Sequence, residues 1–70
     1  MTVTVTLNGE QRELPDGATV ADAVAAVGAP SDGRGVAAAV DGEVVPRGSW
    51  SSQPLGADAR VEVLQAVQGG

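Results

Sequence analysis

The sequence of 70 residues is long enough for one domain and too short for two hydrophobic cores. Its net charge is −5, with nine acidic residues, four arginines and no lysine, which disfavours binding to nucleic acid or to anionic membranes. There is no histidine or cysteine, so the commonest general base, the thiolate nucleophile and the usual zinc ligands are excluded. We therefore expect neither a self-sufficient enzyme nor a metal site.

The apolar residues are small, which limits what the core can enclose. Twelve valines and twelve alanines are accompanied by four leucines, one tryptophan and no phenylalanine or tyrosine. Such a core can hardly wall off a ligand cleft of several hundred Å³. The lack of cysteine, of a signal peptide and of a long apolar run leads us to expect a cytoplasmic protein.

A strand is predicted over residues 2–7, where polar and apolar residues alternate. The dipeptide Asn8-Gly9 is typical of a two-residue type I′ turn. Residues 10–14 should therefore fold back as a polar edge strand that stops at Pro15. The buried face of the first strand is expected to consist of Val3, Val5 and Leu7.

A helix is predicted to begin after Thr19, which can serve as its N-cap, with Asp22 completing a weak capping box. Gly28 supplies a C-terminal stop and Pro30 prevents the helix from restarting, so residues 28–35 should form a loop. The expected apolar stripe of the helix, spaced i, i+3, i+4 and i+7, is Val20, Ala23, Val24 and Val27.

The second half repeats the hairpin pattern. A strand over 36–40, a turn at Asp41-Gly42 and a short strand over 43–45 are followed by an irregular stretch over 47–59. Residues 60–67 then alternate as a last strand. In this strand, Val61 and Val63 are expected to face the helix, and Glu62 and Leu64 to face away from it. Leu55 should point into the core. The remaining expectation concerns three aspartates that should serve in turns: Asp16, Asp41 and Asp58.

The resulting order, β-β-α-β-β-β, is that of an α+β β-grasp domain, in which a mixed sheet of about five strands packs on one main helix. The helix-containing connection should return the last strand beside the first, and these two strands can run parallel at the centre of the sheet. Residues 1–66 are expected to form this domain, and residues 67–70 a flexible C-terminal tail.

With these motifs in place, the chain resembles the ThiS family of thiamine-biosynthesis sulfur carriers, which are small ubiquitin-like proteins. The matching segments are "NGE" near the start, Val45-Pro46-Arg47, Trp50, Pro54-Leu55 and Gly69-Gly70. The sequence departs from the family pattern in two turns, where Asp41 stands in place of the usual Asn and "GADARV" carries an additional Ala.

The resemblance implies a carrier that acts as a co-substrate and binds no cofactor of its own. An ATP-dependent, ThiF-like enzyme would adenylate the carboxylate of Gly70. A sulfur donor such as a cysteine desulfurase would then provide the sulfur of a thiocarboxylate, and a ThiG-like thiazole synthase would receive it. Activation is needed because a carboxylate is ionised at neutral pH and lacks a leaving group.

Other residues receive roles within this scheme. Gly69, Gln68 and Val67 would thread into partner active sites, since glycine permits close approach of the backbone. Leu64, expected to face outward, would help to dock the partner enzymes. Trp50 is expected to plug the core at one end of the helix, and Arg47 to pair with an acid and fix its loop.

Three alternatives share parts of this pattern. A small-subunit-like sulfur carrier for molybdopterin synthase has the same fold and tail, but such chains tend to be longer and richer in aromatic residues. A ubiquitin-like protein modifier would form isopeptide bonds through Gly70, although without lysine it could not build chains on its own side chains. The third alternative is a binding module with an incidental tail.

Overall fold

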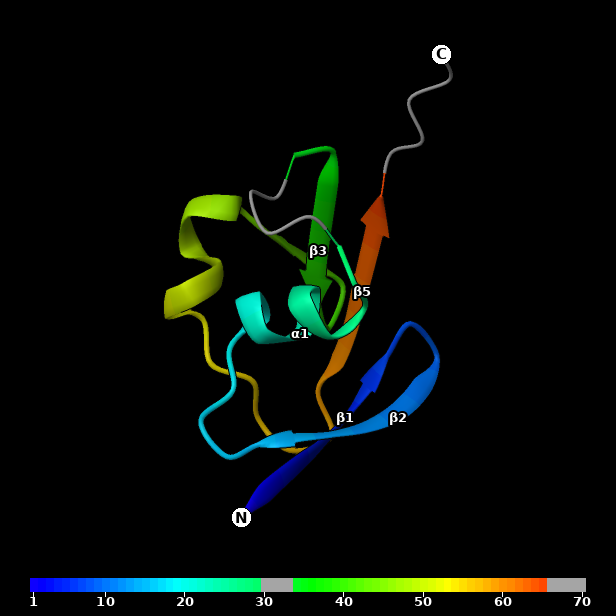
Figure 1. Ribbon diagram of the computed structural model, residues 1–70, viewed down its shortest axis with the longest axis vertical. Coiled ribbons are helices and arrows are strands. Elements are labelled where there is room, and N and C mark those ends of the chain that lie inside the picture. Colours follow the sequence, from blue (N-terminus) through cyan, green and yellow to red (C-terminus); the bar gives the residue numbers. More distant parts are fainter. Residues whose placement is uncertain (30–33, 66–70) are drawn as a thin grey trace.

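The computed structural model describes residues 1–29 and 34–65, and within them the predicted order of strands and helix is confirmed. These residues form one mixed sheet with the strand order β2-β1-β5-β3-β4 (Figure 1). The strands are β1 (Thr2–Leu7), β2 (Glu10–Pro15), β3 (Val36–Val40), β4 (Glu43–Val45) and β5 (Arg60–Gln65); the helices are α1 (Val20–Ala26) and the 3₁₀-helix η1 (Arg47–Ser52).

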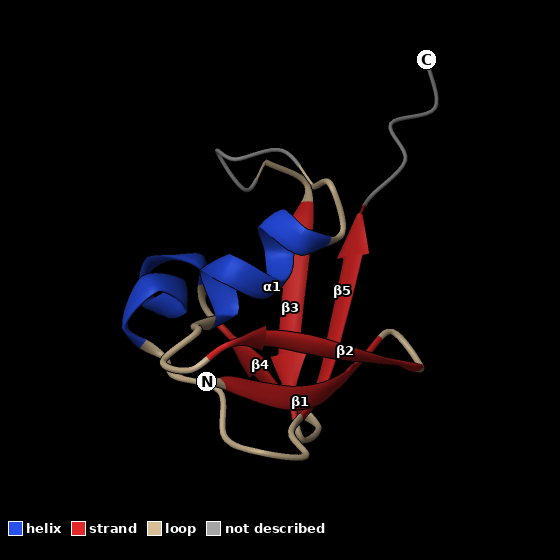
Figure 2. Ribbon diagram, turned by 60° about the horizontal axis from the view of Figure 1, so that its bottom comes forward, coloured by secondary structure: helices blue, strands red, loops and turns tan. Residues whose placement is uncertain are grey.

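The centre of the sheet is the parallel pair β1 and β5, as the sequence predicts. Leu7 lies opposite Val61, whereas the β1–β2, β3–β4 and β3–β5 pairs are antiparallel. A parallel pair requires a long crossover connection, and here that connection contains α1, which lies over one face of the sheet (Figure 2). Strand β5 therefore pairs with a strand on each side, β1 and β3.

The hairpin turns follow from their central residues. Asn8 and Gly9 have φ values of 51° and 83°, and Asp41 and Gly42 have 50° and 86°, as a type I′ turn requires. β2 runs one residue further than expected, to Pro15. An edge strand tolerates this proline because its missing N–H removes no hydrogen bond from the interior of the sheet.

Helix α1 is short and is capped at both ends. The Asp22 carboxylate accepts a hydrogen bond from the backbone N–H of Thr19 at 2.8 Å, which confirms the expected N-terminal cap. At the other end, Ala29 N–H donates to the Val24 carbonyl and Gly28 N–H to the Ala25 carbonyl, at 3.3 and 3.0 Å. This is a Schellman motif, and Gly28 permits it with φ of 77°.

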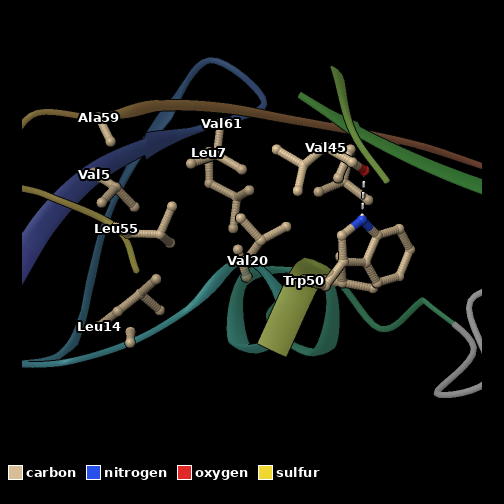
Figure 3. Close-up of a cluster of buried hydrophobic side chains, with 14 of the residues drawn as sticks. Val5, Leu7, Leu14, Val20, Val45, Trp50, Leu55, Ala59 and Val61 are labelled. Atoms are coloured by element: carbon tan, nitrogen blue, oxygen red, sulfur yellow. Dashed lines mark hydrogen bonds between the residues drawn. The ribbon is translucent and has the colours of Figure 1, made fainter. Parts of the chain in front are cut away.

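The core lies between α1 and the facing side of the sheet (Figure 3). Val5, Val20 and Val61 are fully buried, and burial of each valine is worth about 1.5–3 kcal/mol relative to exposure. Leu55 is also buried, as expected. The strands and helix contribute to this core mainly Val3, Val5, Leu7, Leu14, Val20, Ala23, Val24, Ala38, Val45, Val61 and Val63.

One stretch differs from its prediction. Residues 47–59 were expected to be irregular, but Arg47–Ser52 form η1. The helix begins with a hydrogen bond from Ser49 N–H to the Pro46 carbonyl at 2.8 Å. Short 3₁₀-helices carry no long apolar repeat, so the periodicity that reveals α1 has no counterpart here.

Candidate functional site

The candidate site is built on strand β5, the last strand of the described residues. It is the third strand of five in the described sheet, with β1 on one edge and β3 on the other. Val61 and Val63 are buried while Glu62 and Leu64 are exposed, so the two predicted faces of the strand are confirmed. The expected tail residues Val67, Gln68, Gly69 and Gly70, and the last two residues of the predicted strand, lie outside the described residues.

The face of the sheet opposite α1 carries a small apolar patch. Leu64 lies opposite Ala37 on β3, and Ala39 lies opposite Val44 on β4. Directly opposed residues share a face, and residues two apart on a strand, such as Ala37 and Ala39, also share a face. The four side chains therefore lie on one surface, called here the outer patch. Leu64 is 67% exposed and Val44 is 75% exposed.

The outer patch holds most of the large exposed apolar side chains of the described residues. Among described residues, three large apolar side chains are exposed, and two of them, Val44 and Leu64, belong to the patch. Glu62, opposite Ala39, and Arg60, opposite Thr6, continue the same face with charged groups. The patch is therefore apolar at one end of β5 and bordered by both signs of charge.

The sequence predicts the position of Leu64 but misses Val44. A signal for Val44 exists, because a two-residue turn at Asp41-Gly42 fixes the register of the hairpin. That register places Val44 opposite Ala39, two residues along β3 from the partner of Leu64. The turn does not fix the pairing of β3 with β5, which is also needed to place Val44 and Leu64 in one patch.

The comparison with known families gives a match over nearly the whole chain. The model of the ThiS family matches residues 5–70. The chain belongs to the ThiS family. The match covers β5 and continues through Gly69 and Gly70.

A solved structure supports the same fold for this ThiS-family protein. The thiamine biosynthesis protein ThiS from Geobacter metallireducens is 21% identical, with a TM-score of 0.74. The alignment covers 97% of this chain and 100% of that one. The comparison with curated proteins gave no match. The sheet and helix of this ThiS-family protein are thus those of a β-grasp domain.

Trp50 belongs to the hydrophobic core of this ThiS-family protein. Its side chain is 6% exposed and lies in η1, which contacts α1. The indole Nε1–H donates a hydrogen bond to the Val45 carbonyl at 2.8 Å (Figure 3). The ring therefore fills the core and also satisfies a backbone group of edge strand β4.

Arg47 and the aspartates lie in or beside turns. Arg47 is the exposed first residue of η1, and its pairing with an acid stays a prediction. Asp41 and Asp58 have φ of 50° and 63°, which agrees with their expected turn roles. Asp16 donates its backbone N–H to the Met1 carbonyl at 2.9 Å.

Two features of residues 1–29 and 34–65 bear on metal binding and on membranes. These residues contain no group of three His, Cys, Asp or Glu side chains that could hold a metal ion. No helix in this part of the chain is long and apolar enough to cross a membrane.

Proposed function

We propose that this ThiS-family protein is a sulfur carrier of thiamine biosynthesis that holds the sulfur on the C-terminal carbonyl of Gly70. The observation that carries the proposal is the family match over residues 5–70, which includes Gly69-Gly70. The β-grasp fold alone would not suffice, because one fold can host many functions.

The chemistry proceeds on partner enzymes. The Gly70 carboxylate attacks the α-phosphorus of ATP on a ThiF-like enzyme, which forms an acyl adenylate and releases pyrophosphate. A persulfide sulfur, supplied through a cysteine desulfurase or another donor, displaces AMP. Reductive cleavage of the resulting S–S bond by a thiol leaves the thiocarboxylate, whose sulfur a ThiG-like thiazole synthase incorporates into the thiazole ring.

The chain itself supplies a handle and a reactive end. Without side chains, Gly69 and Gly70 permit the close backbone approach that a narrow active site demands. Binding no cofactor, the carrier leaves ATP and the sulfur donor to its partners. It therefore acts as a co-substrate of those enzymes.

The outer patch is proposed as the docking surface for both partner enzymes. Its four apolar side chains lie on β5, the strand that leads to the terminus, and on β3 and β4, which follow β5 in the sheet. Six peptide units separate Leu64 from Gly70, and an extended chain of that length reaches about 20 Å at most. A partner that binds the patch must place its active site within that distance.

The proposal is tested by ATP–pyrophosphate exchange with the ThiF-like enzyme. The full chain should support exchange, and a variant lacking Gly70 should not, although it retains all described strands. Exchange that is equally fast without Gly70 would contradict the assignment of the carrier terminus.

The same reactions discriminate the alternative functions. Covalent transfer of the chain to lysines of other proteins would indicate a modifier. Sulfur transfer to a molybdopterin synthase in place of a thiazole synthase would indicate the other carrier class. In both outcomes Gly70 is still activated, so only the downstream acceptor changes.

A further inference from the structure

The parallel ladder between β1 and β5 ends before β5 does. Its register pairs Thr6 with Arg60 and Leu7 with Val61, and the chain then turns away at Asn8. Strand β5 continues to Gln65. The backbone groups of Val63 on this edge therefore lie past the last residue of β1.

Asn8 supplies the hydrogen bonds that the missing strand would have made. Its backbone N–H donates to the Val61 carbonyl at 2.9 Å. Its side-chain Oδ1 accepts from Val63 N–H at 2.7 Å, and its Nδ2 donates to the Val63 carbonyl at 3.1 Å. The carboxamide thus acts as one more rung of the ladder, called here the Asn8 clasp, across 55 positions of sequence.

The turn at Asp41 makes a related contact with the other end of β5. Asp41 N–H donates to the Arg60 carbonyl at 2.8 Å, and its Oδ1 accepts from Arg60 N–H at 3.0 Å. Here the backbone is the donor, so the side chain needs only to accept. At Asn8 the backbone donor is committed to Val61, so the side chain must both accept and donate.

This difference accounts for the residue type in each turn. An ionised carboxylate only accepts hydrogen bonds, whereas a carboxamide accepts and donates. Aspartate therefore serves at position 41, but at position 8 it would leave the Val63 carbonyl without its donor. Both residue types tolerate the left-handed φ of these turns.

We propose that Asn8 is a positioning residue that fixes the direction in which β5 leaves the fold toward Gly70. The clasp holds Val63 from the β1 side, while β3 pairs with Leu64 from the other side. Without the Asn8 clasp, the end of β5 pairs with β3 alone. The outer patch then no longer has a fixed orientation relative to the terminus. The consequence for Gly70 rests on the proposed carrier function; the clasp itself does not.

The clasp is tested by NMR amide exchange, which requires no partner enzyme. Asn8→Gly keeps a turn compatible with positive φ and removes the carboxamide. Exchange at Val63 should become about five- to tenfold faster, as expected for loss of a hydrogen bond in a partly buried site. Val5, in the core of β1, is the internal reference: an equal increase at Val5 and Val63, or no increase at Val63, overturns the clasp.

The functional consequence is tested by a reciprocal exchange of residue types. Asn8→Asp removes the donor to Val63, whereas Asp41→Asn keeps the acceptor that Arg60 uses. With the ThiF-like enzyme, Asn8→Asp should lower kcat for adenylation about tenfold with little change in KM, because the outer patch still binds while the terminus is misplaced. Asp41→Asn should leave both parameters unchanged.

Three outcomes would each overturn the positioning role of Asn8. They are a change in KM without a change in kcat, equal effects of the two substitutions, and an unaltered kcat in Asn8→Asp. Absence of adenylation with the unaltered chain would instead overturn the proposed function, and the exchange rate at Val63 would still decide whether the clasp exists. The failures of the two proposals are therefore distinguishable.

Discussion

At the scale of single residues, Leu64 carries the docking proposal. Its side chain is 67% exposed, so it contributes little to the core, and a charge placed there would meet water in the free protein. In a docked complex the same charge would be desolvated against an apolar surface. Binding and folding should therefore respond differently to substitution.

We predict that Leu64→Asp lowers kcat/KM for adenylation at least tenfold and changes the free energy of unfolding by no more than about 0.5 kcal/mol. Steady-state adenylation kinetics and urea denaturation measure the two effects. Gln11→Asp, an exposed position on edge strand β2, is the charge control and should leave adenylation unchanged. Unaltered kinetics in Leu64→Asp would exclude the docking role.

Val44 tests whether the outer patch extends beyond Leu64. We predict that Val44→Asp also weakens adenylation, because Val44 lies on the same face at the edge strand β4. Binding of the ThiF-like enzyme, measured by isothermal titration calorimetry, should weaken in this variant as in Leu64→Asp. If Val44→Asp binds like the unaltered chain, the docking surface is limited to β5 and β3.

Trp50 belongs to the core and should affect stability more than function. Trp50→Phe keeps most of the ring volume and removes the donor to the Val45 carbonyl, which should cost about 1–3 kcal/mol. Trp50→Ala should cost about 3–5 kcal/mol. Urea denaturation followed by circular dichroism gives both values, and a loss below about 0.5 kcal/mol in Trp50→Ala would contradict a core role.

At the scale of elements, α1 depends on its ends because it spans only seven residues. Isolated helices of this length are unstable in water, so caps and packing must hold it. Thr19, Asp22 and Gly28 mark these ends in the sequence, and the structure places them as predicted. The contacts that close the helix are local, which is why sequence reasoning finds them.

We predict that Gly28→Ala destabilises the protein by about 1 kcal/mol or more. A Cβ at Gly28 would meet no atom within 4 Å, so the cost arises from its φ of 77° alone. Gly48→Ala is the matched control: its Cβ would also meet nothing, and its φ is outside the left-handed region. Equal midpoints of urea denaturation for the two variants would refute the assigned strain.

Other elements show where prediction from sequence ends. The hairpin turns at Asn8-Gly9 and Asp41-Gly42 have strong local signals, and both form. Helix η1 has no such signal. The Asn8 clasp depends on which residues of β1 and β5 face each other, and that register is a long-range property that no local pattern specifies.

At the scale of the whole molecule, the order of elements was sufficient to predict the fold. A helix between two hairpin-like units directs the final strand to the centre of the sheet, and β5 lies there between β1 and β3. The outward position of Leu64 followed from the alternation of β5. The patch around it did not, because Val44 joins it only through the β3–β4 and β3–β5 registers.

In the proposed function the folded domain would be the handle, and the carboxylate of Gly70 would be the reactive end. The outer patch would bind each partner, the Asn8 clasp would direct β5, and Gly70 would carry the sulfur. The chemical steps of this proposed function would take place on the partner enzymes.

The most direct test of the central claim is the intact mass of the protein after incubation with ATP, the ThiF-like enzyme, a cysteine desulfurase, cysteine and a thiol reductant. We expect a gain equal to one sulfur replacing one oxygen, located by fragmentation on the C-terminal peptide that contains Gly70. An unchanged mass, or recovery of the chain only in covalent attachment to another protein, would contradict it.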